Sequence, residues 1–296
     1  YWVSAAVRER GIVCALSGDG GDEAFGGYSR FWRANRLVQL MRAPAWARRA
    51  AVGAGRALAA RTRDWGRQVA KAAELAEAGR RDAAVVLAGL SSYLTEAQKA
   101  ELVLPEARRD LAPAARLFDG YDPAAVADVE ELSRRLTDTL FRVVLPSDML
   151  RKVDMMSMRA GIEVRVPLLD EDVVGLGLSL PHRLKTDGRS GKLVPRALAR
   201  AWLPPAAARH PKHGFTIPLD VMLPPAFHQA AADLLVAPGA RTAAFLDRRL
   251  VEGWLAGLAS TRDGRAGGAI SREGRYQRVL MLLSLELWLR DRGLSW

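Results

Sequence analysis

Cysteine, lysine and long apolar runs are scarce in this chain of 296 residues. The one cysteine, Cys14, excludes an internal disulfide and a cysteine-based metal cluster. The longest apolar stretch, residues 279–289, is too short to span a bilayer and contains Glu286, so we expect a buried helix there. The first residues also do not follow the pattern of a secretory signal peptide. These features favour a cytoplasmic location without a membrane partner.

Positive charge exceeds negative charge, and the formal net charge is +11. The arginines are scattered along alanine-rich sequence, without the interleaved aromatic residues or motifs of nucleic-acid-binding proteins. We therefore expect no nucleic-acid partner and interpret the charge as an affinity for anionic small molecules. The four histidines do not have the spacing of metal ligands; they are His182, His210, His213 and His228.

Two short segments are predicted to be strands. Residues 11–17 form a continuous apolar run closed by glycines, which is typical of a strand covered by helices on both faces. Cys14 lies in this run, so we expect a packed core thiol. Apolar and polar residues alternate over residues 162–166, which predicts an extended segment with one polar face.

Most of the remaining sequence is predicted to be helical. Residues 126–143 carry one apolar stripe, and Pro146 is expected to end that helix before Ser147 caps the next one. Thr95 and Gln98 form a capping-box pattern at the start of another helix. Further helices are predicted over residues 192–203 and 275–290, with a mobile loop at 263–271 before the last one.

The chemistry is concentrated in the sequence LSGDGGDE, residues 16–23, at the end of the first predicted strand. Ligands of open α/β sheets bind at the carboxyl ends of strands, and glycines let backbone N–H groups approach a phosphate closely. Asp19 and Asp22 would share one side of a helical turn, so one carboxylate could bind Mg²⁺ and the other could transfer a proton. The alternative is an acidic surface turn with Asp22 as an N-cap.

Two further blocks complete a recognisable pattern. LSGDGGDE-x-FGGY is followed by LPSDMLRKVDMMSM…EVRVPLLD over residues 145–170 and by PKHGFTIP over residues 211–218. This pattern resembles the synthetase domain of glutamine-hydrolysing asparagine synthetases, and the resemblance extends from about Cys14 to the terminal helix.

The resemblance implies an α/β fold like that of the adenine nucleotide α-hydrolases, of the ATP-pyrophosphatase type. This chain would be predominantly α-helical with few strands. Residues 1–296 would form the C-terminal portion of one synthetase domain, with residues 45–120 as a helical insert. The implied reaction activates the side-chain carboxylate of aspartate with ATP and Mg²⁺. The resulting β-aspartyl-AMP is attacked by ammonia to give asparagine and AMP.

Roles for individual residues also follow from the resemblance. Asp19 and Lys212 would be catalytic, and Asp22 would help to hold Mg²⁺. ATP would be bound by Ser17, Gly18 and Lys152. Lys152 and Lys212 have an alternative interpretation as ordinary solvated lysines. The remaining candidates, which would contact substrate or brace the site, are Glu23, Glu163 and Arg165; the last two are two positions apart and could pair with each other.

The sequence departs from the family in two respects. Asp19 stands where some members have glutamate, which changes reach but not charge. The phosphate-binding S-G-G-x-D-S loop and the N-terminal glutaminase domain of the family do not occur in these residues. We therefore expect the C-terminal part of a longer synthetase, inactive as this fragment alone. Aspartate, ATP and glutamine-derived ammonia would be its partners, and a homodimer remains open.

Three functional alternatives remain at this point. The first is asparagine synthetase itself. The second is a related amide ligase or cyclase of a natural-product or sugar pathway, a group in which β-lactam synthetases often replace the third position of the acidic block with tyrosine. Asp19 is intact and favours transfer of ammonia. The third is a non-catalytic remnant of the domain, which the retained Asp19, Asp22, Lys152 and Lys212 argue against.

Overall fold

The computed structural model describes residues 1–59, 72–77, 83–118, 126–209, 219–259 and 272–294. The described residues are predominantly helical with two short strands, as the sequence predicts. The chain divides into two compact units, each built from segments distant in sequence. Unit 1 comprises residues 1–45, 76–90 and 120–211, and unit 2 comprises residues 46–75, 91–119 and 212–296.

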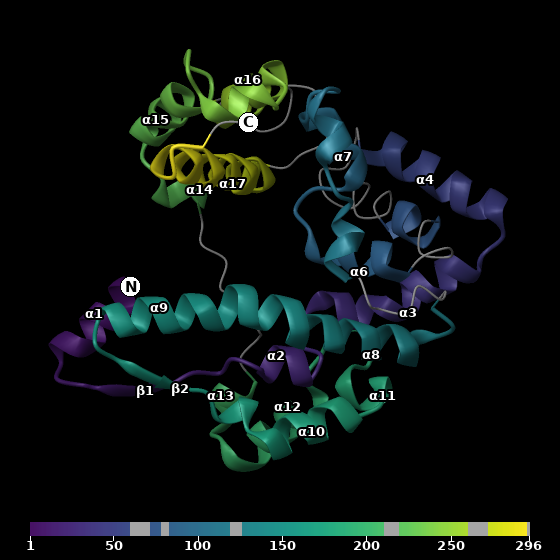
Figure 1. The fold of residues 1–296 in the computed structure, drawn as a ribbon. Coiled ribbons are helices and arrows are strands. Elements are labelled where there is room, and N and C mark those ends of the chain that lie inside the picture. Colours follow the sequence, from purple (N-terminus) through teal and green to yellow (C-terminus); the bar gives the residue numbers. More distant parts are fainter. Residues whose placement is uncertain (60–71, 78–82, 119–125, 210–218, 260–271, 295–296) are drawn as a thin grey trace. The chain divides into compact units, whose positions relative to one another are not determined.

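Unit 1 contains both strands of the described chain (Figure 1). Its elements in chain order are α1 (Trp2–Glu9), β1 (Cys14–Leu16), α2 (Gly21–Ala24), α3 (Ser29–Arg42), α6 (Ala83–Ser91, whose last residue falls in unit 2), α8 (Val129–Thr139), the π-helix η3 (Leu140–Leu150), α9 (Arg151–Arg159), β2 (Glu163–Arg165), η4 (Pro167–Leu169), α10 (Glu171–Ser179), α11 (His182–Lys185), α12 (Leu193–Trp202) and α13 (Pro205–Ala208).

Strands β1 and β2 are parallel neighbours, with Cys14 opposite Glu163 and Leu16 opposite Arg165. Helix α9 packs against β2, and helix α1 packs against α9. The expectation of a strand buried on both faces is wrong, because Cys14 is exposed and Leu16 is 76% exposed. Within the described residues β2 is the one strand that pairs with β1, so the sheet is too narrow to bury β1.

Helices α8, η3 and α9 follow one another without a break and form one long helical segment (Figure 1). Asp128 caps its start by accepting a hydrogen bond from the backbone N–H of Glu131 at 2.9 Å. The prediction that Pro146 ends the helix and that Ser147 caps the next one is wrong. Both residues lie inside η3, where the wider π turn accommodates a proline that lacks a backbone N–H.

The apolar stripe of α8 is buried as its spacing predicts. Leu132 and Leu136 are buried on this helix, and Leu140 and Leu145 continue the buried face into η3. Helix α3 packs against α8. The α3 side chains that are buried are Phe31, Ala34, Leu37, Val38 and Met41. This core fixes α8 and η3, and the short helix α2 packs against η3.

Unit 2 is a helical bundle. Its elements are α4 (Ala45–Ala59, whose first residue falls in unit 1), α7 (Glu96–Leu102), η1 (Ala107–Asp110), η2 (Ala114–Phe118), α14 (Leu219–Met222), α15 (Pro225–Leu235), η5 (Arg241–Ala244), α16 (Arg248–Ala259) and α17 (Arg272–Asp291). Helix α17 packs against α14, α15, α16 and η5 and supplies much of the core, including Tyr276, Val279 and Leu282. The predicted terminal helix is thus confirmed, whereas the predicted loop at 263–271 lies outside the described residues.

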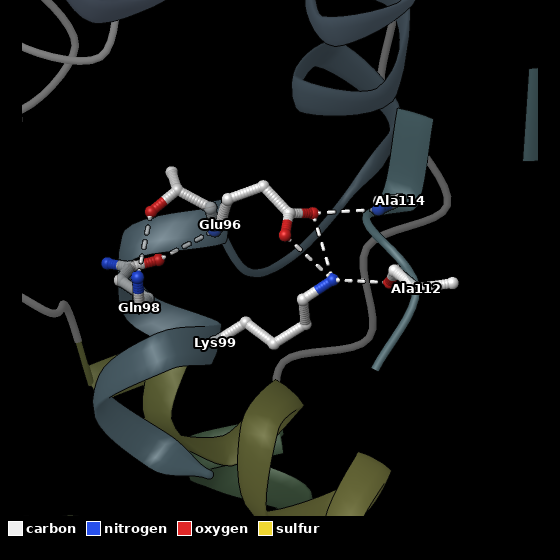
Figure 2. Close-up of polar contacts among 6 residues, drawn as sticks. Glu96, Gln98, Lys99, Ala112 and Ala114 are labelled. Atoms are coloured by element: carbon white, nitrogen blue, oxygen red, sulfur yellow. Dashed lines mark hydrogen bonds and ion pairs between the residues drawn. The ribbon is translucent and has the colours of Figure 1, made fainter. Parts of the chain in front are cut away.

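Helix α7 begins with the predicted capping box. The backbone N–H of Gln98 donates to Thr95 Oγ1 at 3.2 Å, and the backbone N–H of Thr95 donates to Gln98 Oε1 at 3.1 Å. Glu96 and Lys99 then tie the following loop to the helix (Figure 2). Lys99 Nζ donates to the carbonyl of Ala112 at 3.1 Å, and Glu96 Oε1 accepts from the backbone N–H of Ala114 at 2.8 Å.

None of the described helices is both long and apolar enough to cross a membrane.

Candidate functional site

The glycine-rich acidic loop begins where the two parallel strands end. The backbone N–H of Ser17 donates to the carbonyl of Arg165 at 2.9 Å and thus continues the ladder by one residue. The chain then turns at Gly20, which has a φ of +89°, and enters α2. A side chain at Gly20 would collide with the side chain of Leu169, so glycine is required by both conformation and space.

Asp19 lies at the start of this loop. Its Oδ2 accepts a hydrogen bond of 2.5 Å from the hydroxyl of Ser17, and its side chain is half-buried. This bond fixes the direction of the Asp19 carboxylate next to the ends of β1 and β2. Ser17, Gly18 and Asp19 thus follow directly on the paired strand ends, and their functional role stays a prediction.

Asp22 is the second carboxylate of the loop, and its Oδ1 lies 3.1 Å from the ammonium nitrogen of Lys192. A side chain at Gly27 would overlap the Asp22 carboxylate, so Gly27 makes room for this contact. Lys192 was not among the site residues predicted from the sequence. The one local feature that could have drawn attention to Lys192 is its position immediately before a helix, where the helix dipole disfavours positive charge. Gly20, rather than Asp22, is the N-cap of α2, so the alternative of an N-capping role for Asp22 is wrong.

Glu23 is buried and braces the loop from inside. Its Oε1 accepts a hydrogen bond of 2.5 Å from the hydroxyl of Tyr28, which belongs to the FGGY segment. Burial and this hydrogen bond raise the pKa of Tyr28, so the phenol stays protonated as the donor. The guanidinium of Arg30 lies 5.0 Å from the centre of the Tyr28 ring.

Glu163 and Arg165 lie on β2 and form the predicted ion pair, with 2.8 Å between Oε1 and Nε. Both side chains are exposed, so the pair adds little to stability but keeps the strand end polar. Lys152 lies on α9 and is 59% exposed, and its contacts are on its own helical segment: Asp148 Oδ1 at 3.8 Å and Met149 Sδ at 3.5 Å. Lys212 lies outside the described residues.

The acidic loop is supported by a buried lysine. Lys185 of α11 is 3% exposed, and its Nζ donates to Thr137 Oγ1 of α8 at 3.3 Å. The nearest contact that a side chain at Gly26 would make is with the Cβ of Lys185, so this lysine lies directly beneath the end of the loop. Burial lowers the pKa of Lys185 to about 8, although the charge of Glu130 acts in the opposite direction.

We expect the stability of unit 1 to rise with pH in the alkaline range. The folded pKa of Lys185 is about 8 and its ordinary value is 10.5, so between these values the unfolded chain binds more protons than the folded one. The free energy of unfolding should therefore increase by up to about 3 kcal/mol between pH 8 and 10.5. Urea titrations across this range provide the measurement. Lys185→Met should remove the increase, and an equal slope in both proteins would contradict the prediction.

Metal-ligating side chains do not gather in groups of three or more among the residues that the structure describes. Asp22 is nevertheless oriented toward a cation, since the ammonium of Lys192 lies against it. Mg²⁺ is usually held by one or two protein carboxylates together with phosphate oxygens and water. A loop that contributes a single oriented carboxylate fits that requirement.

Comparisons with known proteins give the family of this chain. The model of the asparagine synthase family matches residues 1–290. The chain belongs to the asparagine synthase family. A curated relative, glutamine-hydrolysing asparagine synthetase 1 of Bacillus subtilis (strain 168), is 25% identical over 223 residues. These cover 74% of this chain and 33% of that protein, so the match spans about a third of the relative.

Proposed function

We propose that these residues belong to an ATP-dependent ligase that converts aspartate to asparagine. The observation that carries the proposal is the loop of Ser17, Asp19 and Asp22 at the ends of two parallel strands, in a chain of the asparagine synthase family. A side-chain carboxylate oxygen of aspartate would attack the α-phosphorus of ATP, and pyrophosphate would leave. Ammonia would then attack the acyl carbon of β-aspartyl-AMP, and AMP would leave.

Within this proposal each loop residue has a separate role in binding ATP, holding the metal ion or transferring a proton. Ser17 and Gly18 would contact ATP, and Asp22 would hold Mg²⁺, which neutralises charge on the phosphates when it is bound. Asp19 would accept a proton from the attacking ammonia. Glu23 would brace the loop through Tyr28. Glu163 and Arg165 would keep the end of β2 polar beside the substrate.

The two candidate lysines would act on negative charge. Lys212 would stabilise charge on the phosphate and on the tetrahedral intermediate. Lys152 would face the pyrophosphate or the substrate, and because its side chain is exposed it can leave Asp148 at little cost. Ammonia would come from glutamine hydrolysed by a glutaminase domain outside residues 1–296.

We also propose how the chain is organised. Residues 1–296 would be the C-terminal portion of one synthetase domain with an adenine nucleotide α-hydrolase-like fold, and residues 45–120 would be a helical insert. The parallel pair β1–β2 supports this, because parallel strands are typical of α/β folds. The family match over residues 1–290 supports treatment of both compact units as one functional domain.

The function can be tested by pyrophosphate release from the full-length protein. We expect release that requires both ATP and aspartate, with asparagine as the product when glutamine or ammonia is present. Pyrophosphate release without asparagine would favour the related amide ligases and cyclases. Failure to release pyrophosphate with any carboxylate substrate would favour a non-catalytic remnant of the domain.

A further inference from the structure

Lys192 and Asp22 form a contact between two parts of unit 1 that are distant in sequence. The Nζ of Lys192 lies 3.1 Å from Asp22 Oδ1, and each side chain is slightly more than one quarter exposed. The backbone N–H of Lys192 also donates to the carbonyl of Phe25 at 3.2 Å, which ties the lysine to the same loop through its main chain.

Two features of Lys192 are unfavourable where it stands. Its φ is +59°, and among the described residues it is the one non-glycine residue with a positive φ. An L-residue in the left-handed region carries a conformational cost. Lys192 is also the N-cap of α12, where the positive end of the helix dipole opposes a cation. Both the backbone conformation and the helix dipole disfavour lysine at this position. The contact of its ammonium with Asp22 explains why a lysine stands there.

The glycines of the loop make room for this contact. An added side chain at Gly27 would meet both the Asp22 carboxylate and the Cε of Lys192, and one at Gly21 would lie 3.8 Å from the Lys192 Nζ. The ammonium is therefore enclosed by the acidic loop itself. In this position it occupies space beside Asp22 that a metal ion bound to the same oxygen would need.

We propose that Lys192 is a positioning residue that holds the Asp22 carboxylate when no metal ion is bound and competes with a divalent cation for it. The inference rests on the proposed function only in taking Asp22 as the cation ligand. Two cations beside one carboxylate oxygen repel each other, so a divalent ion bound to Asp22 Oδ1 would displace the ammonium. The released ammonium would then be available to pair with negative charge on a phosphate.

The test is a titration of the nucleotide-free protein with Mn²⁺ alone, in which electron paramagnetic resonance measures the affinity for Mn²⁺. Lys192→Gly removes the ammonium and relieves the positive φ, so the variant should fold, with a thermal midpoint at or above that of the wild type. We expect it to bind Mn²⁺ about fivefold more tightly, which corresponds to the loss of one partly exposed ion pair. Lys192→Arg should bind like the wild type. Lys192→Asn, which also tolerates a positive φ, provides a second uncharged variant.

Two controls test whether the change in Mn²⁺ affinity acts through Asp22. Lys99→Met removes a lysine that is paired with Glu96 in unit 2 and should leave Mn²⁺ binding unchanged. In an Asp22→Asn background, the Lys192→Gly substitution should no longer change the affinity. The proposal is overturned if Lys192→Gly binds Mn²⁺ no more tightly than the wild type, including the case in which neither binds. Aspartate-dependent pyrophosphate release by the wild type would then show that the proposed function stands without this inference.

Discussion

Replacement of Glu286 by alanine should lower the free energy of unfolding of unit 2 by about 3–5 kcal/mol. Glu286 is fully buried on α17, and its carboxylate accepts hydrogen bonds from the backbone N–H groups of Arg241 and Thr242 at 2.9 and 2.8 Å. It also accepts from the hydroxyl of Thr242 at 2.8 Å and from Arg290 Nε at 2.6 Å. The substitution would leave a cavity and several buried donors without an acceptor.

Urea unfolding followed by circular dichroism would measure this loss. Glu252→Ala is the matched control, because Glu252 lies on the neighbouring helix α16 and pairs with Arg248 at 2.8 Å while half-exposed. A pair of that kind contributes about 0.5 kcal/mol. Glu286→Gln keeps one acceptor oxygen and should lie between the two. Equal losses for Glu286→Ala and Glu252→Ala would show that the buried network adds nothing beyond an ordinary surface pair.

The stabilisation contributed by Glu286 should also depend on pH in the acid range. Burial alone would raise the pKa of Glu286, but the hydrogen bonds from Thr242, Arg290 and Arg241 outweigh it, and the pKa lies below its ordinary value of 4.5. The stabilisation is therefore fully present above pH 4.5 and is lost as the pH falls through the lower folded value. The difference in stability between wild type and Glu286→Gln should shrink on acidification in this range.

Elements with strong local signals could be predicted from the sequence. The capping box at Thr95, the extended segment at 163–165 and the helices at 193–202 and 272–291 all lie where periodicity and turn residues place them. Their determinants are residues two to four positions apart, so no knowledge of the rest of the chain was needed. The position of the acidic loop at the end of a strand was predictable for the same reason, because its candidate side chains are almost adjacent in sequence.

The wrong predictions concern positions where distant residues decide the outcome. Pro146 normally ends a helix, but here the flanking helices α8 and α9 are held by packing, and the backbone between them widens to a π-helix. Cys14 lies in an apolar run that is typical of a core strand, but its side chain is exposed, because burial depends on how many strands lie beside it. The pairing of Lys192 with Asp22 likewise depends on the path of the chain through α10 and α11, which no local pattern reports.

Asp19→Asn should reduce asparagine formation by the full-length protein by about 100- to 10,000-fold, the contribution typical of a positioned proton acceptor. The amide has almost the same size as the carboxylate, and its oxygen can still accept the hydrogen bond from the hydroxyl of Ser17. The loop should therefore keep its shape while losing the ability to take a proton from ammonia. Asparagine and pyrophosphate should be measured in the same reaction.

The pair of measurements locates the step at which Asp19 acts. If its carboxylate serves the attack of ammonia, pyrophosphate release should persist while asparagine formation falls. If both fall together, Asp19 also acts in formation of the acyl-adenylate. Asp172→Asn, an exposed carboxylate at the start of α10, makes the same change in charge outside residues 16–23 and should leave both rates near those of the wild type. Wild-type asparagine formation by Asp19→Asn would remove Asp19 from the chemistry, leaving it only the local hydrogen bond with Ser17.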